Sequence, residues 1–179
     1  MPNWCSNNIS ITGPKDKIKA LWEAAQKPEE DGGGLLQAMR PMPKFDNDGN
    51  DVMPNWWNWR VANWGTKWEL STEGLQFTEN EDGTATISGW AESAWAPPVD
   101  AFAFFFDETN DMTGRLSYYE PGMCFVGVWT SEEGDNCVEY GGFTSKNVRD
   151  AIGAELDDEW NVSEQMAEWE EENEEEESE

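Results

Sequence analysis

The sequence predicts an α+β protein with a ferredoxin-like core, in which an antiparallel sheet carries two helices on one face. Two observations lead to this prediction. Segments that alternate apolar and polar residues, as strands do, are interrupted twice by segments with apolar residues at helical spacing. The order is strand, helix, long insertion, two strands, helix and strand, followed by extra C-terminal strands, and its first six regular elements form a split βαβ unit.

The first strand and the first helix are expected at the N-terminus. Ile9 and Ile11 alternate with polar residues in NNISITG, which predicts a strand. Pro14 suits the first position of a helix, and Ile18 and Leu21 follow at helical spacing. The glycines of EEDGGG then end this helix.

Residues 29–68 are predicted to form a long, irregular insertion that is rich in tryptophan. They show no sustained periodicity, and NWWNWRVANWGTKW, residues 55–68, contains five tryptophans. Disordered segments are poor in aromatic residues, so we expect an ordered loop whose indoles hold it against the sheet. The string DNDGND resembles the start of a calcium loop, but its twelfth position is Trp57 rather than glutamate, so no metal site is expected.

The later elements are a hairpin, a helix and three strands. EGLQFTE and TATISGW flank the turn-like NEDG and predict the hairpin. Val99, Phe102 and Phe106 mark one face of a helix that Pro97 and Pro98 precede. GRLSYYE, CFVGVWT and NCVEYGGF are the strand candidates that follow.

The chain is expected to divide at residue 154. Residues 1–154 would form the ferredoxin-like domain, and residues 155–179 a disordered acidic tail. This tail contains fourteen acidic residues and no basic one, and repulsion between like charges keeps such a segment solvated. Trp160, Met166 and Trp169 fit a weak amphipathic helix in its first part.

The balance of charge argues against direct binding of DNA or RNA. The chain has 38 acidic and 11 basic residues, and its net charge is −27. Such a surface repels phosphate backbones. It would equally suit a protein that imitates a polyanion.

The sequence does not indicate an enzyme, a cofactor or a membrane partner. Histidine is absent, which excludes the common nucleophile–histidine pairs and imidazole-ligated zinc. No apolar run is long enough to span a membrane, and the N-terminus lacks the basic and apolar regions of a secretory signal. Cys5, Cys124 and Cys137 have no close partner in the sequence and fit reduced thiols, so the expected location is the cytoplasm.

Four strings resemble a family of phage and plasmid proteins. They are MPNWCSN, NWGTKW, AWAPP and YYEPGMCFVGVW, in the order that the family has them and across residues 1–143. On these strings the chain is similar to the YubB ferredoxin-like (Api-like) domain family. The resemblance implies the fold, a mobile-element origin and an accessory role against a host defence protein, in the cytoplasm of the host cell.

The candidate ligand site is the tryptophan-rich segment. An indole beside a lysine can hold a planar anion by stacking and charge, and Trp64, Lys67 and Trp68 lie around the turn at Gly65. The alternative is that these indoles only pack against the sheet. The candidate ligand-binding residues are Arg60, Trp64, Gly65, Thr66, Lys67, Trp68, Trp95, Arg115, Tyr119 and Glu120.

Two functions follow from these observations. The first is a non-enzymatic accessory protein that captures a small nucleotide-like ligand, such as a second messenger of host defence. The alternative is an acidic nucleic-acid mimic that inhibits a host DNA-binding or restriction enzyme. The mimic needs its acidic groups on rigid structure, whereas more than a third of them fall in the tail that is expected to be disordered. Exposed indoles would also favour a homo-oligomer.

Overall fold

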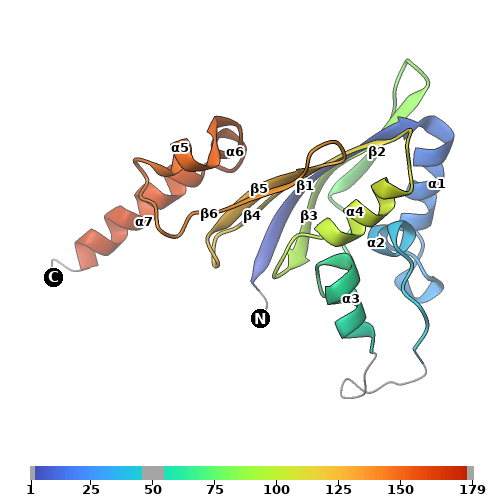
Figure 1. Cartoon of the computed structure of the whole chain (residues 1–179), viewed down its shortest axis with the longest axis horizontal. Coiled ribbons are helices and arrows are strands. Elements are labelled where there is room, and N and C mark those ends of the chain that lie inside the picture. Colours follow the sequence, from blue (N-terminus) through green and yellow to red (C-terminus); the bar gives the residue numbers. More distant parts are fainter. Residues whose placement is uncertain (1–2, 46–54, 177–179) are drawn as a thin grey trace.

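A computed structural model describes residues 3–45 and 55–176, with side chains to residue 173. The described residues form an antiparallel sheet of six strands in the order β2-β3-β1-β4-β5-β6 (Figure 1). The strands are β1 (Trp4–Pro14), β2 (Leu75–Glu79), β3 (Thr84–Ala94), β4 (Thr113–Glu120), β5 (Phe125–Thr130) and β6 (Gly134–Glu139). The α-helices are α1 (Lys15–Ala25), α2 (Leu35–Met39), α3 (Trp56–Trp64), α4 (Val99–Asp107), α5 (Val148–Ile152), α6 (Ala154–Trp160) and α7 (Val162–Glu176).

The predicted α+β fold class is confirmed. β1 lies in the centre and pairs antiparallel with both β3 and β4, so that Ile9 faces Gly89 on one side and Leu116 on the other. With β2 paired to β3, the elements β1-α1-β2-β3-α4-β4 form the split βαβ core. β5 and β6 extend the sheet beyond β4, as the extra C-terminal strands that the sequence predicts.

Helices α1 and α4 cover one face of the sheet because each has a single apolar stripe. Alternation along β1 buries Ile9 and Ile11 on this face. Ile18 of α1 and Phe102 of α4 pack against them in the main hydrophobic core. The short helix α2 joins this layer, and its Leu35 is fully buried.

The segment expected to be an irregular insertion is partly helical in its described residues. A short 3-10 helix (Glu29–Asp31) and α2 precede residues 46–54, and α3 follows them. Asn55 caps α3 by accepting a hydrogen bond from the main-chain nitrogen of Asn58 at 2.9 Å, and Gly65 ends it with a φ of 84°. The prediction of irregular structure is therefore wrong for α3, whereas residues 40–45 and 65–68 are irregular and a short helix before Pro41 was expected at the position of α2. DNDGND lies outside the described residues.

The prediction of a disordered tail is also wrong for the described residues beyond 154. Helices α5, α6 and α7 pack at the β4–β6 end of the sheet, on the face opposite to α1 and α4 (Figure 1). Consecutive strand residues point to opposite faces, so Tyr118 joins the main core while Tyr119 joins a second cluster. Leu156, Trp160 and Val162 complete that cluster, and their burial holds the acidic segment on the sheet.

None of the helices in the described ranges is both long enough and apolar enough to cross a membrane.

Candidate functional site

Trp4, Trp68 and Trp95 surround Lys67 on the surface, and we call these four residues the tryptophan–lysine cluster. The ring centroids of Trp4 and Trp68 are 5.8 Å apart, at an interplanar angle of 43°. The Nζ of Lys67 lies 5.0 Å from the ring centroid of Trp68 and 5.2 Å from that of Trp95. The three tryptophans are 48%, 36% and 42% exposed, so aromatic surface beside a cation is accessible to solvent.

The cluster is held together by contacts between α3 and the ends of two strands. Thr66 is buried, and its Oγ1 donates to the carbonyl of Ala94 at 2.9 Å and accepts from the nitrogen of Ala94 at 3.1 Å. These bonds fix the residues after α3 at the end of β3, next to Trp95. The pairing of Trp4 with Ala94 then brings the start of β1 to the same place.

Gly65 is required by the turn that leads into the cluster. Its φ of 84° lies in the left-handed region, and a Cβ atom there would stand 2.9 Å from the carbonyl oxygen of Pro97. Gly65 and Thr66 thus position the cluster rather than contact a ligand.

Among the residues that the structure describes, no acid neutralises the charge of Lys67. No described residue forms an ion pair with Lys67. By contrast, Lys15 and Lys17 pair with Glu79 and Asp111, each at 2.6 Å. A lysine that contacts only aromatic rings retains its capacity to pair with an anion.

Carboxylates border a separate cavity next to the cluster. This cavity of about 340 Å³ is lined by Gly65 and by Asp100, Asp135 and Glu139. Because these side chains are acidic, the cavity disfavours an anion and is distinct from the tryptophan–lysine cluster.

Trp64 belongs to the interior, and Arg60 packs on it while lining a separate cavity of about 590 Å³ with Trp56 and Lys44. Trp64 is fully buried, and its Nε1 donates to the carbonyl of Arg40 at 2.9 Å. The guanidinium of Arg60 stacks 4.6 Å from the centroid of the Trp64 ring and pairs with Glu29 at 2.6 Å. The prediction that Trp64 offers a stacking face is wrong, because the packing alternative applies to this residue.

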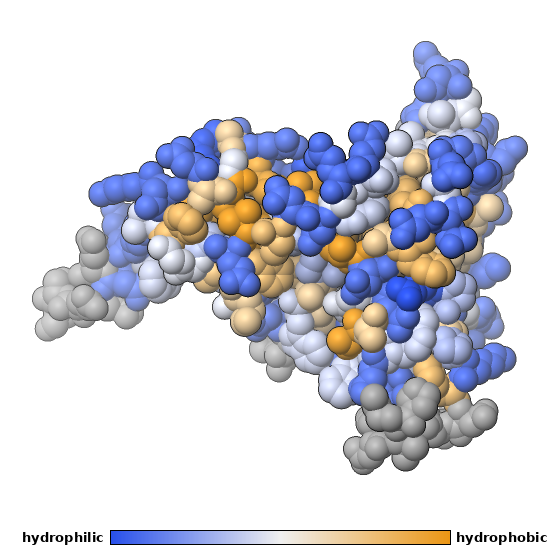
Figure 2. Space-filling model, in the orientation of Figure 1, coloured by the Kyte–Doolittle hydropathy of each residue, from blue (hydrophilic) through white to orange (hydrophobic). Residues whose placement is uncertain are grey.

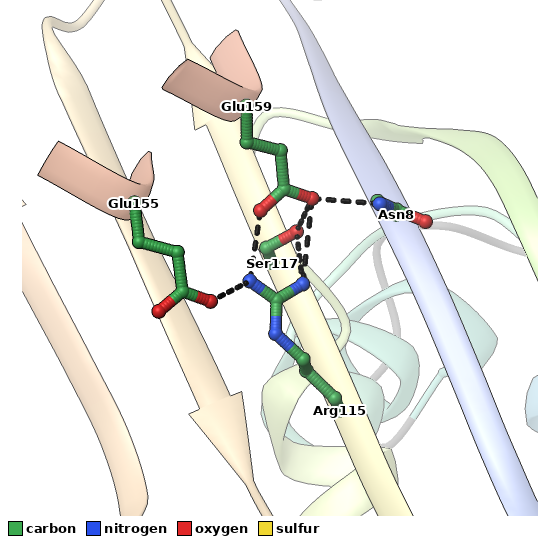
Figure 3. Close-up of polar contacts among 5 residues, drawn as sticks. All are labelled: Asn8, Arg115, Ser117, Glu155 and Glu159. Atoms are coloured by element: carbon green, nitrogen blue, oxygen red, sulfur yellow. Dashed lines mark hydrogen bonds and ion pairs between the residues drawn. The ribbon is translucent and has the colours of Figure 1, made fainter. Parts of the chain in front are cut away.

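Arg115 forms ion pairs with two glutamates on the face of the sheet opposite to α1 and α4 (Figure 3). Its Nη2 pairs with Glu159 of α6 at 2.8 Å and with Glu155 at 3.0 Å. Glu159 also accepts hydrogen bonds from Asn8 at 2.6 Å and from Ser117 at 2.5 Å. Burial raises the pKa of Glu159, but the hydrogen bonds from Arg115, Ser117 and Asn8 outweigh it and hold the net pKa below its usual value. Arg115 therefore anchors α6 and does not join the tryptophan–lysine cluster.

Tyr119 and Glu120 are structural as well. The ring of Tyr119 is buried and stacks on the rings of Tyr140 and Trp160, with centroids 6.2 and 5.7 Å away. The carboxylate of Glu120 is buried and accepts hydrogen bonds from the main-chain nitrogens of Gly122, at 3.0 Å, and Met123. Glu120 thus stabilises the turn between β4 and β5, where sequence reasoning suggested a ligand contact.

The structure thus separates the ten candidate residues into three groups. Lys67, Trp68 and Trp95 come together on the surface, whereas Gly65 and Thr66 position them. The others, Arg60, Trp64, Arg115, Tyr119 and Glu120, make contacts within the protein. Sequence reasoning missed Trp4, although this residue lies beside the first predicted strand and within MPNWCSN, one of the strings that resemble the family.

The titratable groups do not form an obvious catalytic or metal centre. Within residues 3–45 and 55–176, no group of three or more His, Cys, Asp or Glu side chains could hold a metal ion. Cys5, Cys124 and Cys137 are free, and burial raises the pKa of Cys5 to about 12, which leaves it protonated at neutral pH.

The fold and the site define an α+β protein with a split βαβ sheet and an open aromatic surface that contains one lysine. No protein-family model matches the chain, and no curated protein matches it. A crystal structure of the protein api92 from Yersinia pseudotuberculosis, described under the family DUF1281, is similar to this chain. The alignment covers 80% of this chain and 99% of the api92 chain. The TM-score is 0.48 and the identity 10%, so the similarity assigns no function. Membership of the YubB ferredoxin-like family stays a prediction.

Proposed function

We propose that this is a non-enzymatic binding protein that captures a small, planar, anionic ligand of the nucleotide type on the tryptophan–lysine cluster. The observation that carries the proposal is the cation of Lys67, which no described acid neutralises, between the exposed rings of Trp68 and Trp95. A nucleobase would stack on an indole while its phosphate pairs with the ammonium group.

The strength of such a site can be bounded. Stacking of one base on one aromatic side chain contributes about 1–3 kcal/mol by alanine substitution. Loss of one indole should therefore weaken binding by about 5- to 150-fold. Because the cluster is open rather than enclosed, ligands with two bases, which can engage two rings, should bind more tightly than mononucleotides.

A biological role follows if the resemblance to phage and plasmid proteins holds. The ligand would then be a cyclic nucleotide that acts as a second messenger of host defence, and binding would sequester it in the host cytoplasm. The absence of histidine from the sequence supports capture rather than conversion of the ligand.

Isothermal titration of the full chain with a panel of cyclic di- and trinucleotides tests this proposal. Lys67→Gln and Trp68→Ala should each lower the affinity of the panel member that binds. The matched controls are Lys19→Gln, at an exposed lysine of α1, and Trp57→Ala, at an indole of α3 that is 38% exposed. Absence of binding across the panel, with folding verified by circular dichroism, would refute the proposal.

A second candidate function is imitation of nucleic acid toward a host DNA-binding or restriction enzyme. The observation in its favour is that helices α6 and α7 hold acids of the C-terminal segment on the sheet. Rigid display of this kind is what a mimic requires. Inhibition of a restriction enzyme by the wild-type chain but not by Glu168→Gln/Glu171→Gln/Glu172→Gln would support it, and equal potency of the two would reject it.

A further inference from the structure

An apolar cleft lies between α7 and the β4–β6 end of the sheet, and it shares no residue with the tryptophan–lysine cluster. Its volume is about 470 Å³. The lining is mostly aromatic and apolar, with Tyr119, Tyr140, Phe143, Met166 and Trp169 among its residues. Figure 2 shows apolar residues gathered on the sheet beside the C-terminal helices, with hydrophilic residues around them.

Large apolar side chains at this cleft are left uncovered. Trp169 is 65% exposed and Phe143 is 40% exposed, and Met123, in the turn beside Cys124 of the lining, is 66% exposed. Exposed aromatic and methionine side chains that border a cleft are characteristic of protein interaction sites, in which they act as anchors.

The walls of the cleft are fixed by hydrogen bonds within the protein. Glu170 of α7 accepts from the nitrogen of Ser145 at 2.9 Å and from its hydroxyl at 2.6 Å, which ties α7 to the segment after β6. Gln165 donates to the carbonyl of Trp160 at 2.7 Å, which ties α7 to α6. A partner would therefore meet a preformed surface and would lose little affinity to reorganisation.

Negative charge predominates along α7, and Lys146 is a basic residue near the lining residue Glu170. Glu164, Glu168, Glu171 and Glu172 are exposed, and no basic residue follows Arg149 in the sequence. A second copy of the chain would place acid against acid at this surface, and a nucleic acid would be repelled in the same way. The complementary partner is apolar at its centre and positively charged at its edges.

We propose that this cleft binds a basic amphipathic helix of a partner protein. The apolar face of that helix, with residues at spacing i, i+3 or i+4 and i+7, would enter the cleft beside Met166 and Trp169. Its lysines and arginines would be attracted by the glutamates of α7. Glu172, three residues after Trp169, is nearest to the apolar wall, whereas Glu168 and Glu171 act at longer range because helical spacing turns them away from the cleft. The inference does not depend on the tryptophan–lysine cluster.

Fluorescence anisotropy with two labelled synthetic peptides tests the inference on the full chain. Both consist of the same leucines and lysines over 18 residues; one has them in amphipathic order and the other in scrambled order. At about 150 mM salt, where charge alone is largely screened, the amphipathic peptide is expected to bind at least tenfold more tightly. Equal binding of the two peptides, or binding of neither, would overturn the inference.

Variants locate the binding on the chain. Trp169→Ala should weaken binding of the amphipathic peptide about tenfold or more, whereas Trp57→Ala should not change it. Replacing the three α7 glutamates named above with glutamine should weaken binding and flatten its salt dependence. The charge-matched control replaces Glu73, Glu81 and Glu108, which are exposed elsewhere. If Trp169→Ala bound the amphipathic peptide with unchanged affinity, the inference would be refuted. Lys67→Gln should leave peptide binding unchanged, whether or not the tryptophan–lysine cluster binds its proposed ligand.

Discussion

Replacing Trp160 with alanine tests whether the acidic C-terminal segment is an integral part of the fold. The indole is 8% exposed, stacks 5.7 Å from the ring of Tyr119 and meets the ring of Trp90 edge-on at 5.1 Å. Truncation of a buried tryptophan to alanine costs about 3–5 kcal/mol. The buried Nε1 of Trp160 has no hydrogen-bond partner, and its removal relieves a penalty of about 1–3 kcal/mol. The expected net loss is therefore about 2 kcal/mol, the difference between the midpoints of the two ranges.

Urea unfolding measures this loss, with near-ultraviolet circular dichroism as a second probe of the stacked rings. The matched control is Trp169→Ala on the neighbouring helix, where 65% of the residue is already in water. That variant should change the free energy of unfolding by less than about 0.5 kcal/mol. If Trp160→Ala changed the free energy of unfolding as little as Trp169→Ala, the packing of α6 and α7 on the sheet would be contradicted.

Three other predictions concern ionisation, backbone conformation and thiol reactivity. In the folded protein the pKa of Glu159 lies below its usual value of 4.5. The ionised carboxylate therefore stabilises the fold above pH 4.5, and this stabilisation is lost as the pH falls through the lowered pKa. Glu159→Gln should flatten the acid side of a curve of unfolding free energy against pH. Gly65→Ala should lower the unfolding free energy by about 1–2 kcal/mol in thermal unfolding, because φ is 84° and a main-chain oxygen stands 2.9 Å from the new Cβ; no loss would contradict the left-handed turn. In native protein treated with iodoacetamide, mass spectrometry should find Cys137 modified before buried Cys5, and the reverse order would contradict the burial of Cys5.

The elements that could be predicted from the sequence are those in which apolar residues recur with a single period, either that of a strand or that of a helix. Ile9 and Ile11 alternate along β1, and Phe102 and Phe106 follow one face of α4. Each of these elements buries one face, so its pattern identifies both the element and its orientation.

Helix α3 was missed because tryptophans on several sides of the helix hide any apolar stripe. Of its tryptophans only Trp64 is buried, and Trp57 is substantially exposed. The usable signals were Asn55 and Gly65, the cap and the stop of the helix.

The C-terminal segment was predicted only in part: a weak amphipathic helix through Met166 and Trp169 was expected and is present as α7, but the packing of the segment on the sheet was not foreseen. Acidic residues dominate the composition there, while Leu156 and Trp160, one turn apart, supply the buried contacts. Charge repulsion favours disorder only when no apolar residues offset it.

The candidate site was only partly predictable. Lys67 and Trp68 are neighbours in sequence, and Trp95 was a secondary candidate next to the expected helix start. Trp4 joins them through the antiparallel register of β1 and β3, which a single sequence does not specify. Arg115 and Tyr119 were placed at the same site, but their side chains point to the face that α6 covers.

The most direct test of the central claim is the indole N–H spectrum of protein labelled with ¹⁵N-tryptophan during titration with cyclic di- and trinucleotides. A ligand held by the tryptophan–lysine cluster should shift the signals of Trp4, Trp68 and Trp95 and leave that of buried Trp64 in place, and Lys67→Gln should greatly weaken the response. Unchanged spectra across the panel, or shifts that persist undiminished in Lys67→Gln, would contradict it.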